Sequence, residues 1–180
     1  MKLPPAYAWL AKEPAPRILV AALKLYGTTE TKGKADNPVI MEWARGLGRT
    51  IAAAYTADAV PWCALFLSHV CRTLALPVPE GYQALRAFGF LTWGNATPYA
   101  MLGDILVFKR DGGGHVGIYV GEDPDCYHVL GGNQGDRVSI VRISKSRCVA
   151  VRRTPWERRQ PDTVRRIVLE PTGAVSSNEA

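Results

Sequence analysis

The sequence lacks a long hydrophobic run. No stretch approaches the roughly 20 apolar residues that a helix needs to cross a bilayer. Residues 1–20 are interrupted by four prolines and several charged side chains, so they contain no signal-peptide core. We therefore expect no transmembrane segment. We also expect a protein that stays in the cytosol until something else releases it.

Motifs for metals and nucleotides are also missing. Three histidines and four cysteines are too few and too badly spaced for a structural zinc site, and neither HExxH nor CxxC occurs. There is no P-loop and no GxGxxG, and the glycines at 112–114 precede a predicted strand rather than a helix. We expect no metal and no cofactor. Because the expected compartment is reducing, we also expect no disulfide framework.

The composition is that of a folded domain with one basic segment. Hydrophobic residues make up 47% and charged residues 21% of the 180 positions, enough for one core and a short appendage. The net charge of +6 is uneven, because residues 142–166 hold nine Arg and Lys against two acidic residues. Such a segment attracts polyanions, such as an anionic cell envelope. The alternative is a solvated basic face without a specific partner.

The periodicity of apolar residues changes along the chain. Helical spacing dominates the first half, and shorter apolar runs between turn residues dominate the second. Helices are predicted over residues 6–26, 39–47, 62–76 and 83–90, and strands over 104–108, 115–120, 127–130, 138–143 and 148–152. This order is typical of an α+β domain whose strands form an antiparallel meander. We expect a domain over 1–153 and a basic, partly disordered tail over 154–180, with 173–180 disordered.

A cysteine and a histidine stand where a cysteine hydrolase needs them. Cys63 opens the apolar helix of PWCALF, where unpaired N–H groups and the helix dipole lower the pKa of a thiol. His115 begins a strand after three glycines, which permit close approach of a substrate. His69 lies about 240° around the helix from Cys63 and cannot easily reach it. Taken singly, Cys63 could be a core residue and His115 a surface histidine.

A third polar group follows from strand register. If strands 115–120 and 126–131 form a hairpin, His115 faces Gly131, and Asn133 lies diagonally beside the imidazole. The Asn133 amide oxygen could then hold the ring, as in Cys-His-Asn enzymes. A slip of one residue would instead make His128 the orienting group. We favour Asn133.

These segments together resemble the NlpC-type and CHAP cell-wall hydrolases of the papain-like superfamily. The resemblance rests on PWCA at 61–64 with Asp58 upstream, GDILVF at 103–108, GHVG at 114–117, LGGNQGD at 130–136 and the pair Trp93-Gly94. It covers residues 15–153. It implies a papain-like fold, with the nucleophile at a helix N-terminus packed on a C-terminal antiparallel sheet.

The resemblance also implies an activity and its residues. The activity is hydrolysis of amide bonds in the peptide part of peptidoglycan, with Cys63 as nucleophile, His115 as base and Asn133 as orienting residue. CHAP domains carry a glutamate two residues before that asparagine, where this chain has Gly131. No cofactor is required.

Three aromatic residues are weaker candidates for the same site. Trp62 and Trp93 are expected to line the substrate cleft, although both are equally suited to the core. Tyr55 is a candidate side-chain donor to the oxyanion, beside the backbone N–H of Cys63.

The absence of a signal segment fits a phage endolysin, expected as a monomer in the host cytoplasm until its release to the wall. The alternatives are a secreted antibacterial amidase toxin and an inactive wall-binding module. A nucleic-acid-binding protein would rest on the basic segment alone, without a recognisable motif, so we expect no specific nucleic-acid partner. The cleaved bond stays open: a sugar-to-peptide amide, a stem peptide bond or a cross-bridge.

Overall fold

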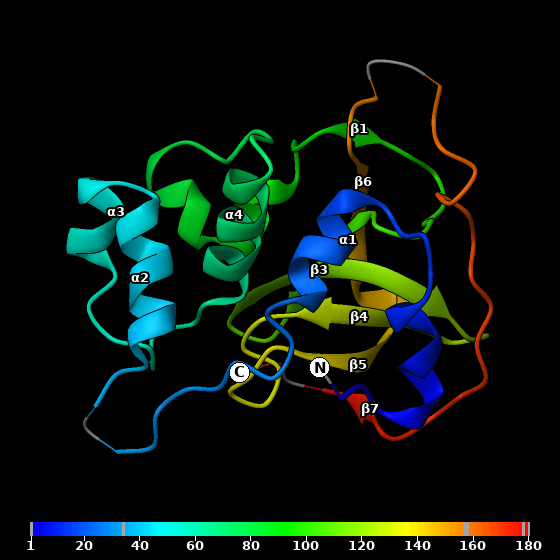
Figure 1. Cartoon of the computed structure of the whole chain (residues 1–180), viewed down its shortest axis with the longest axis horizontal. Helices are drawn as coiled ribbons and strands as arrows, with labels where there is room; N and C mark the ends of the chain where they lie inside the picture. The colour runs from blue at the N-terminus through cyan, green and yellow to red at the C-terminus, as the bar shows by residue number, and fades with distance from the viewer. Residues whose placement is uncertain (1, 34, 157–158, 178, 180) are drawn as a thin grey trace.

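The structure is a computed structural model that describes residues 2–33, 35–156, 159–177 and 179. Within these residues the strands form one seven-stranded sheet, in the order β1-β6-β2-β3-β4-β5-β7. The helix α4 packs against β3 and β4, and α1 and α2 pack on α4 (Figure 1). Helices precede the main strands along the chain, so the α+β prediction is confirmed.

Caps and prolines decide where the helices begin and end. Asn37 Oδ1 accepts the N–H of Val39 at 2.8 Å, and Pro38 takes the first position of α2. The helix predicted over 6–26 is instead two elements, because Pro14 and Pro16 cannot donate the backbone N–H of a continuous helix. The α-helices are α1 (Arg17–Leu23), α2 (Pro38–Gly46), α3 (Arg49–Ala54) and α4 (Cys63–Thr73), and the 3-10 helices are η1 (Pro5–Ala11), η2 (Gly81–Leu85), η3 (Ala87–Phe90) and η4 (Lys145–Arg147).

All five predicted strands are present, and the first four form the predicted antiparallel meander. These four are β2 (Ile105–Arg110), β3 (Gly113–Glu122), β4 (Cys126–Gly131) and β5 (Ser139–Ser144). The fifth, β6 (Cys148–Arg153), requires a correction, because it pairs with β2 rather than extending the meander beyond β5. The short strands β1 (Asn95–Ala96) and β7 (Val175–Ser176) pair with β6 and β5.

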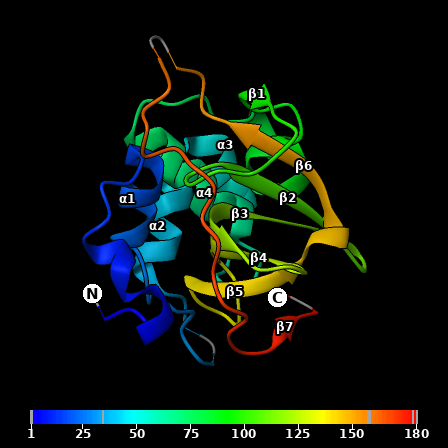
Figure 2. The ribbon, with the colours of Figure 1, turned by 90° about the vertical axis from the view of Figure 1, so that its right-hand side faces the viewer.

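The connection from β5 to β6 requires the sheet to curl. Four Cα steps, at most about 15 Å, join the end of β5 to the start of β6. In the sheet order these strands are four spacings apart, which in a flat sheet is about 19 Å. The sheet therefore bends until β5 and β6 approach each other (Figure 2).

Two apolar clusters fill the two faces of the curled sheet. The larger one lies between α4 and the sheet, where Phe66, Leu67 and Val70 of the predicted apolar stripe are buried. The smaller one includes Phe108 and Tyr119, which point to the opposite face of the sheet. Since side chains alternate along a strand, His115 shares its face with Tyr119.

The tail differs from the prediction, because its described residues pack onto the sheet. The N–H of Glu122 donates to the Ile167 carbonyl at 2.9 Å, and the N–H of Leu169 donates to the Glu122 carbonyl at 2.8 Å. Strand β7 lies within the segment expected to be disordered, and it pairs in parallel with β5. Apolar side chains such as Val164 are buried and join this segment to the main fold.

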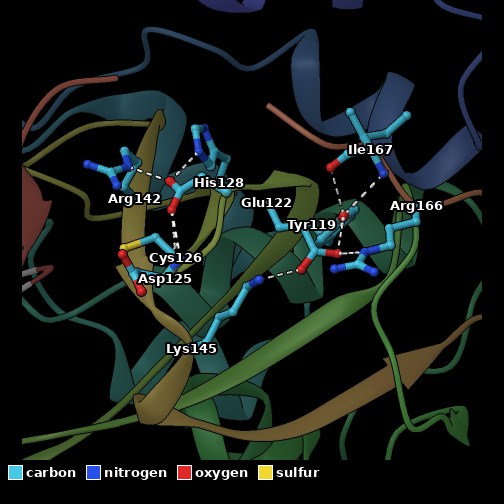
Figure 3. Close-up of polar contacts among 10 residues, drawn as sticks. Tyr119, Glu122, Asp125, Cys126, His128, Arg142, Lys145, Arg166 and Ile167 are labelled. Atoms are coloured by element: carbon cyan, nitrogen blue, oxygen red, sulfur yellow. Dashed lines mark hydrogen bonds and ion pairs between the residues drawn. The ribbon is translucent and has the colours of Figure 1, made fainter. Parts of the chain in front are cut away.

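Glu122 also holds the tail through its carboxylate (Figure 3). It accepts from Lys145 Nζ at 2.6 Å, from Tyr119 Oη at 3.2 Å and from Arg166 Nε. Lys145 lies beside β5 and Arg166 lies in the tail, so one carboxylate joins both segments to the end of β3. These cations hold the pKa of Glu122 below its usual range, although burial acts in the opposite direction.

Most cations of the basic segment 142–166 have a partner within the protein, although Arg159 and Arg166 stay largely exposed. Arg152 donates to the carbonyls of Trp93 and Gly94, at 2.5 and 2.7 Å, and Arg158 lies outside the described residues. The other seven pair with carboxylates: Arg142, Lys145, Arg147, Arg153, Arg159, Arg165 and Arg166. The segment therefore attracts a polyanion less strongly than its sequence charge indicates.

The pair Arg153–Asp104 predicts a clear difference from the exposed pair Arg159–Asp162. The Asp104 side chain is 1% exposed and lies 2.8 Å from Arg153, whereas both side chains of the second pair are almost fully exposed. Arg153→Ala leaves a buried carboxylate without its cation and should lower the free energy of unfolding by about 3 kcal/mol. Arg159→Ala should change it by less than about 0.5 kcal/mol. Urea unfolding of both variants checks this, and equal losses would contradict it.

Candidate active site

Cys63 is the first residue of α4, and the loop before it is held from two sides. Asp58 Oδ2 accepts the backbone N–H groups of Thr31 and Asn37, each at 2.8 Å. Trp62 Nε1 donates to Glu30 Oε1 at 2.7 Å. These bonds tie the loop to the segment after α1, so the start of α4 has a fixed place.

The thiol of Cys63 is buried, at 6% exposure, but it faces several N–H groups. Burial raises the pKa of the thiol above its usual value. The backbone N–H groups of Val116, Ala64 and Cys63 itself and the positive charge of Arg110 lower it. The thiol thus lies beside the residue that follows His115, with donors that would stabilise a thiolate.

His115, the third residue of β3, is 1% exposed and is held by Gln134. Its Nε2 lies 3.0 Å from Gln134 Oε1. Gln134 Nε2 donates to the carbonyls of Val129 and Ser139, at 3.1 and 2.6 Å, so the amide can face His115 only with its oxygen. The imidazole therefore carries its hydrogen on Nε2, which leaves Nδ1 as the basic nitrogen.

Burial lowers the pKa of His115 to about 4. The negative charge of Glu179 and the hydrogen bond that His115 donates to Gln134 raise this pKa. The positive charges of Arg110 and Arg147 lower it further. At neutral pH the imidazole is uncharged. The Cys63 thiol, whose pKa is raised, is uncharged as well.

Gln134, not Asn133, is the residue that contacts His115. The ladder pairs Ile118 with Leu130, which is two residues away from the predicted register, and β4 ends at Gly131. Asn133 lies beyond the strand in a left-handed conformation, with φ of 58°, so the alternation of a strand no longer applies to it. Its side chain is buried, and the described residues offer it no hydrogen bond.

His128, the alternative orienting group, belongs to a different cluster (Figure 3). Its Nε2 lies 2.9 Å from Asp123 Oδ2, and its Nδ1 lies 2.7 Å from the hydroxyl of Tyr7. Asp123 Oδ2 also accepts from Arg142 Nε at 2.7 Å. Both ring nitrogens are thus used in linking η1 to β4 and β5.

The glycine at position 131 lets His115 and Gln134 approach each other. A Cβ at this position would lie 2.8 Å from Gln134 Oε1 and 3.2 Å from His115 Nε2. Any side chain here would therefore push apart the two groups that form the bond. The close approach of His115 to Gln134 requires glycine.

The aromatic candidates do not reach a cleft. Trp62 is fully buried and packs against Trp43, and Trp93 is 5% exposed and donates to the Pro77 carbonyl at 2.7 Å. Tyr55 is buried, and its hydroxyl lies 3.0 Å from the Val60 carbonyl, to which it donates. The expectation that Trp62 and Trp93 line the substrate cleft is therefore corrected: both are core residues. Tyr55 is occupied in holding the loop before Cys63.

Several charged groups near the pair were not expected from the sequence. The positive charge of Arg110 lowers the pKa of both Cys63 and His115. The charge of Arg147 lowers the pKa of His115, and the charge of Glu179 raises it. Gln134 lies in the LGGNQGD motif, next to Asn133, the residue that the sequence predicted to hold the imidazole. By contrast, no local pattern marks Glu179, because it comes from a distant tail.

The described part of the chain offers neither a metal-binding cluster nor a membrane-spanning helix. No group of three or more His, Cys, Asp or Glu residues there could hold a metal ion. None of the described helices is long and apolar enough to cross a membrane. No protein-family model matches the chain, and no curated protein matches its sequence.

The lowered pKa of His115 predicts a pH-dependent stability. An unfolded histidine takes up its proton near pH 6.5, but the folded protein takes it up only near pH 4. His115 therefore does not weaken the folded state above about pH 6.5. Below that pH the unfolded chain takes up the proton first, so the free energy of unfolding falls as the pH falls towards about 4. Between about pH 7.5 and about pH 4.5, the wild type should lose roughly 2 to 3 kcal/mol more of its free energy of unfolding than His115→Asn. Urea unfolding at both pH values measures this, and parallel losses would contradict it.

Proposed function

We propose that the protein is a peptidoglycan hydrolase that cleaves an amide bond in the peptide part of the wall, with a papain-like arrangement of its site. Cys63 is the nucleophile, His115 the base and Gln134 the residue that positions His115. The observation that carries the proposal is that the Cys63 thiol at the start of α4 faces the N–H of Val116, which follows His115 in the chain, while Gln134 holds the imidazole. The motifs around these residues supply the substrate class.

The first step is transfer of the thiol proton and attack on the substrate. His115 Nδ1 takes the proton of Cys63, and the sulfur bonds to the carbonyl carbon of the amide. The imidazolium then gives this proton to the departing amine nitrogen as the C–N bond breaks. This leaves a thioester on Cys63.

Water completes the reaction. His115 takes a proton from a water molecule, whose oxygen attacks the thioester carbon, and the proton returns to the sulfur as the C–S bond breaks. The products are a carboxylate and the free thiol. Gln134 keeps the same ring nitrogen protonated throughout, because its own N–H groups stay bonded to two carbonyls.

The N–H groups at the start of α4 support the charged intermediates. The first turn of a helix leaves backbone donors without intrahelical partners. Those of Cys63 and Ala64 already face the sulfur, so the carbonyl oxygen of a substrate bonded to that sulfur lies near them as well. We assign the backbone N–H of Cys63 to the oxyanion, in place of the earlier candidate Tyr55.

The setting we propose is a phage endolysin released from the host cytoplasm to the wall. Binding to the anionic envelope through residues 142–166 has weaker support, because most cations of this segment are paired within the fold. Recognition of the wall then rests chiefly on the residues around Cys63 and His115.

The nucleophile predicts a complete loss of activity on substitution. Cys63→Ala should release no soluble fragments from purified peptidoglycan, a fall of at least about 1,000-fold, because no other group can form the thioester. Mass spectrometry of the released muropeptides measures this and identifies the cleaved bond. Cys71→Ala, on the same helix and buried in the core, is the matched control. Equal release by wild type and Cys63→Ala would overturn the mechanism.

The hydrogen bond to His115 predicts different effects at two neighbouring positions. Gln134→Ala should lower kcat/KM by about 10- to 100-fold, because the imidazole loses the acceptor that fixes its orientation. Since Gln134 raises the pKa of His115, the acidic limb of the pH profile should also move to lower pH. Asn133→Gly removes the neighbouring side chain but keeps the left-handed backbone, and it should change kcat/KM less than about threefold. The reverse order of effects would restore Asn133 as the positioning residue.

A further inference from the structure

The pair Cys63–His115 is closed off from solvent, and the tail lies across the region beside it. We use the name strap for residues Val175–Ser177 and Glu179. Residues 172–176 line one surface groove together with Tyr7, Gln134 and Arg142. Ser177 lines a second groove together with the three cations Lys109, Arg110 and Arg147 and one acidic residue, Asp111. The strap thus separates these two grooves. The first contains Gln134, the partner of His115, and the second contains the cations.

A carboxylate of the strap is buried on one of these cations. The Glu179 side chain has no exposed surface, and its two oxygens accept from Arg147 Nη1 and Nη2 at 2.8 and 2.7 Å. Arg147 is held in place by other bonds, because its Nε donates to the Lys109 carbonyl and its Nη1 to the Ser176 carbonyl, each at 3.0 Å. The guanidinium therefore presents a two-pronged carboxylate site.

This site lies close to His115. In the sheet, Phe108 of β2 pairs with His115 on one side and with Cys148 of β6 on the other, and Arg147 directly precedes Cys148. Two strand spacings, about 10 Å, therefore separate His115 from this part of the chain. The charges of Arg147 and Glu179 both act on the imidazole, and that of Arg110 acts on both Cys63 and His115.

The strap is held by its carboxylate and by backbone bonds, because β7 pairs with β5 and the Ser176 carbonyl accepts from Arg147 Nη1. Strand β7 has two residues, and one of them, Val175, is about half exposed, so apolar packing contributes little to holding it. The Arg147 side chain keeps 20% of its surface exposed. A second carboxylate arriving along the cationic groove can therefore replace Glu179 on the guanidinium.

We propose that Arg147 is a carboxylate-binding site in the groove beside the strap, two strands from His115, and that Glu179 occupies it in place of the substrate. The ligand is a peptide that carries a free carboxylate within about 10 Å of the amide to be cleaved. The strap must leave before such a peptide reaches Cys63. That the peptide is a substrate rests on the proposed hydrolase function, whereas the carboxylate site and its occupation by Glu179 do not.

Alkylation of Cys63 by two reagents of similar size tests the site in the full chain. Iodoacetamide is neutral and iodoacetate carries a carboxylate, and both form a C–S bond with the thiolate and release iodide. The rate at Cys63 is followed by mass spectrometry of the peptide that contains it, and each rate is divided by that of free cysteine. The corrected ratio of iodoacetate to iodoacetamide reports a carboxylate site beside the thiol.

Glu179→Ala removes the carboxylate of the strap and leaves Arg147. We expect the iodoacetamide rate to rise about tenfold, because the strap opens, and the corrected ratio to rise about tenfold in addition, because the uncovered charge of Arg147 attracts the anionic reagent. Glu179→Ala combined with Arg147→Met should keep the first increase and lose the second. Glu170→Ala, at an exposed glutamate of the same tail, should change neither.

Three results would overturn the proposal: no change of rate in Glu179→Ala, equal increases for both reagents, or a raised ratio that persists without Arg147. Thermal unfolding shows whether each variant is folded, and Glu179→Gln, which keeps the shape of the side chain, should give the same direction of change. The alkylation needs no wall substrate. A raised ratio without release of muropeptides would therefore refute the hydrolase and keep the carboxylate site, and the converse would refute only the site.

Discussion

The close approach of α4 to the end of β4 is the constraint on which the site depends. A Cβ on Gly132 would lie 2.7 Å from Phe66 Cβ and from the Trp62 ring, and one on Gly131 would touch Gln134 and His115. Because both positions are glycine, the first turn of α4 packs directly against the end of β4. This contact places the thiol of Cys63 at the N–H of Val116, the residue that follows His115 in β3.

The same close packing determines the protonation of the pair. Excluding water raises the pKa of Cys63 and lowers that of His115, so both are uncharged in the closed structure. The N–H groups and the arginine that surround them act on the thiol in the opposite direction. A cleft that opens would therefore move the pair towards the thiolate and imidazolium forms. Under the proposed mechanism, access of a substrate and activation of the thiol are then one event.

Charge in this protein acts mainly within the fold. Glu122 joins β3, η4 and the tail, and Asp123 links β3 to β5, because each carboxylate meets more than one cation or donor. The tail can thus form part of the domain although it contributes only short strands. The same pairing gives most cations of the basic segment a carboxylate partner, including Arg159 and Arg166, whose side chains stay largely exposed.

The local pattern of the sequence determined the helix that starts at Cys63, the strand that carries His115 and the meander around it, since capping residues and apolar periodicity act over a few positions. The tertiary structure decided which distant groups these elements and side chains contact. Gln134 rather than Asn133 meets His115, because β4 stops at Gly131 and Asn133 turns the chain. Strand β6 pairs with β2, and Glu179 reaches Arg147, through contacts between distant segments that no local pattern encodes. The sequence by itself thus fixes where a thiol and an imidazole stand on their elements. Packing fixes what holds them and what covers them.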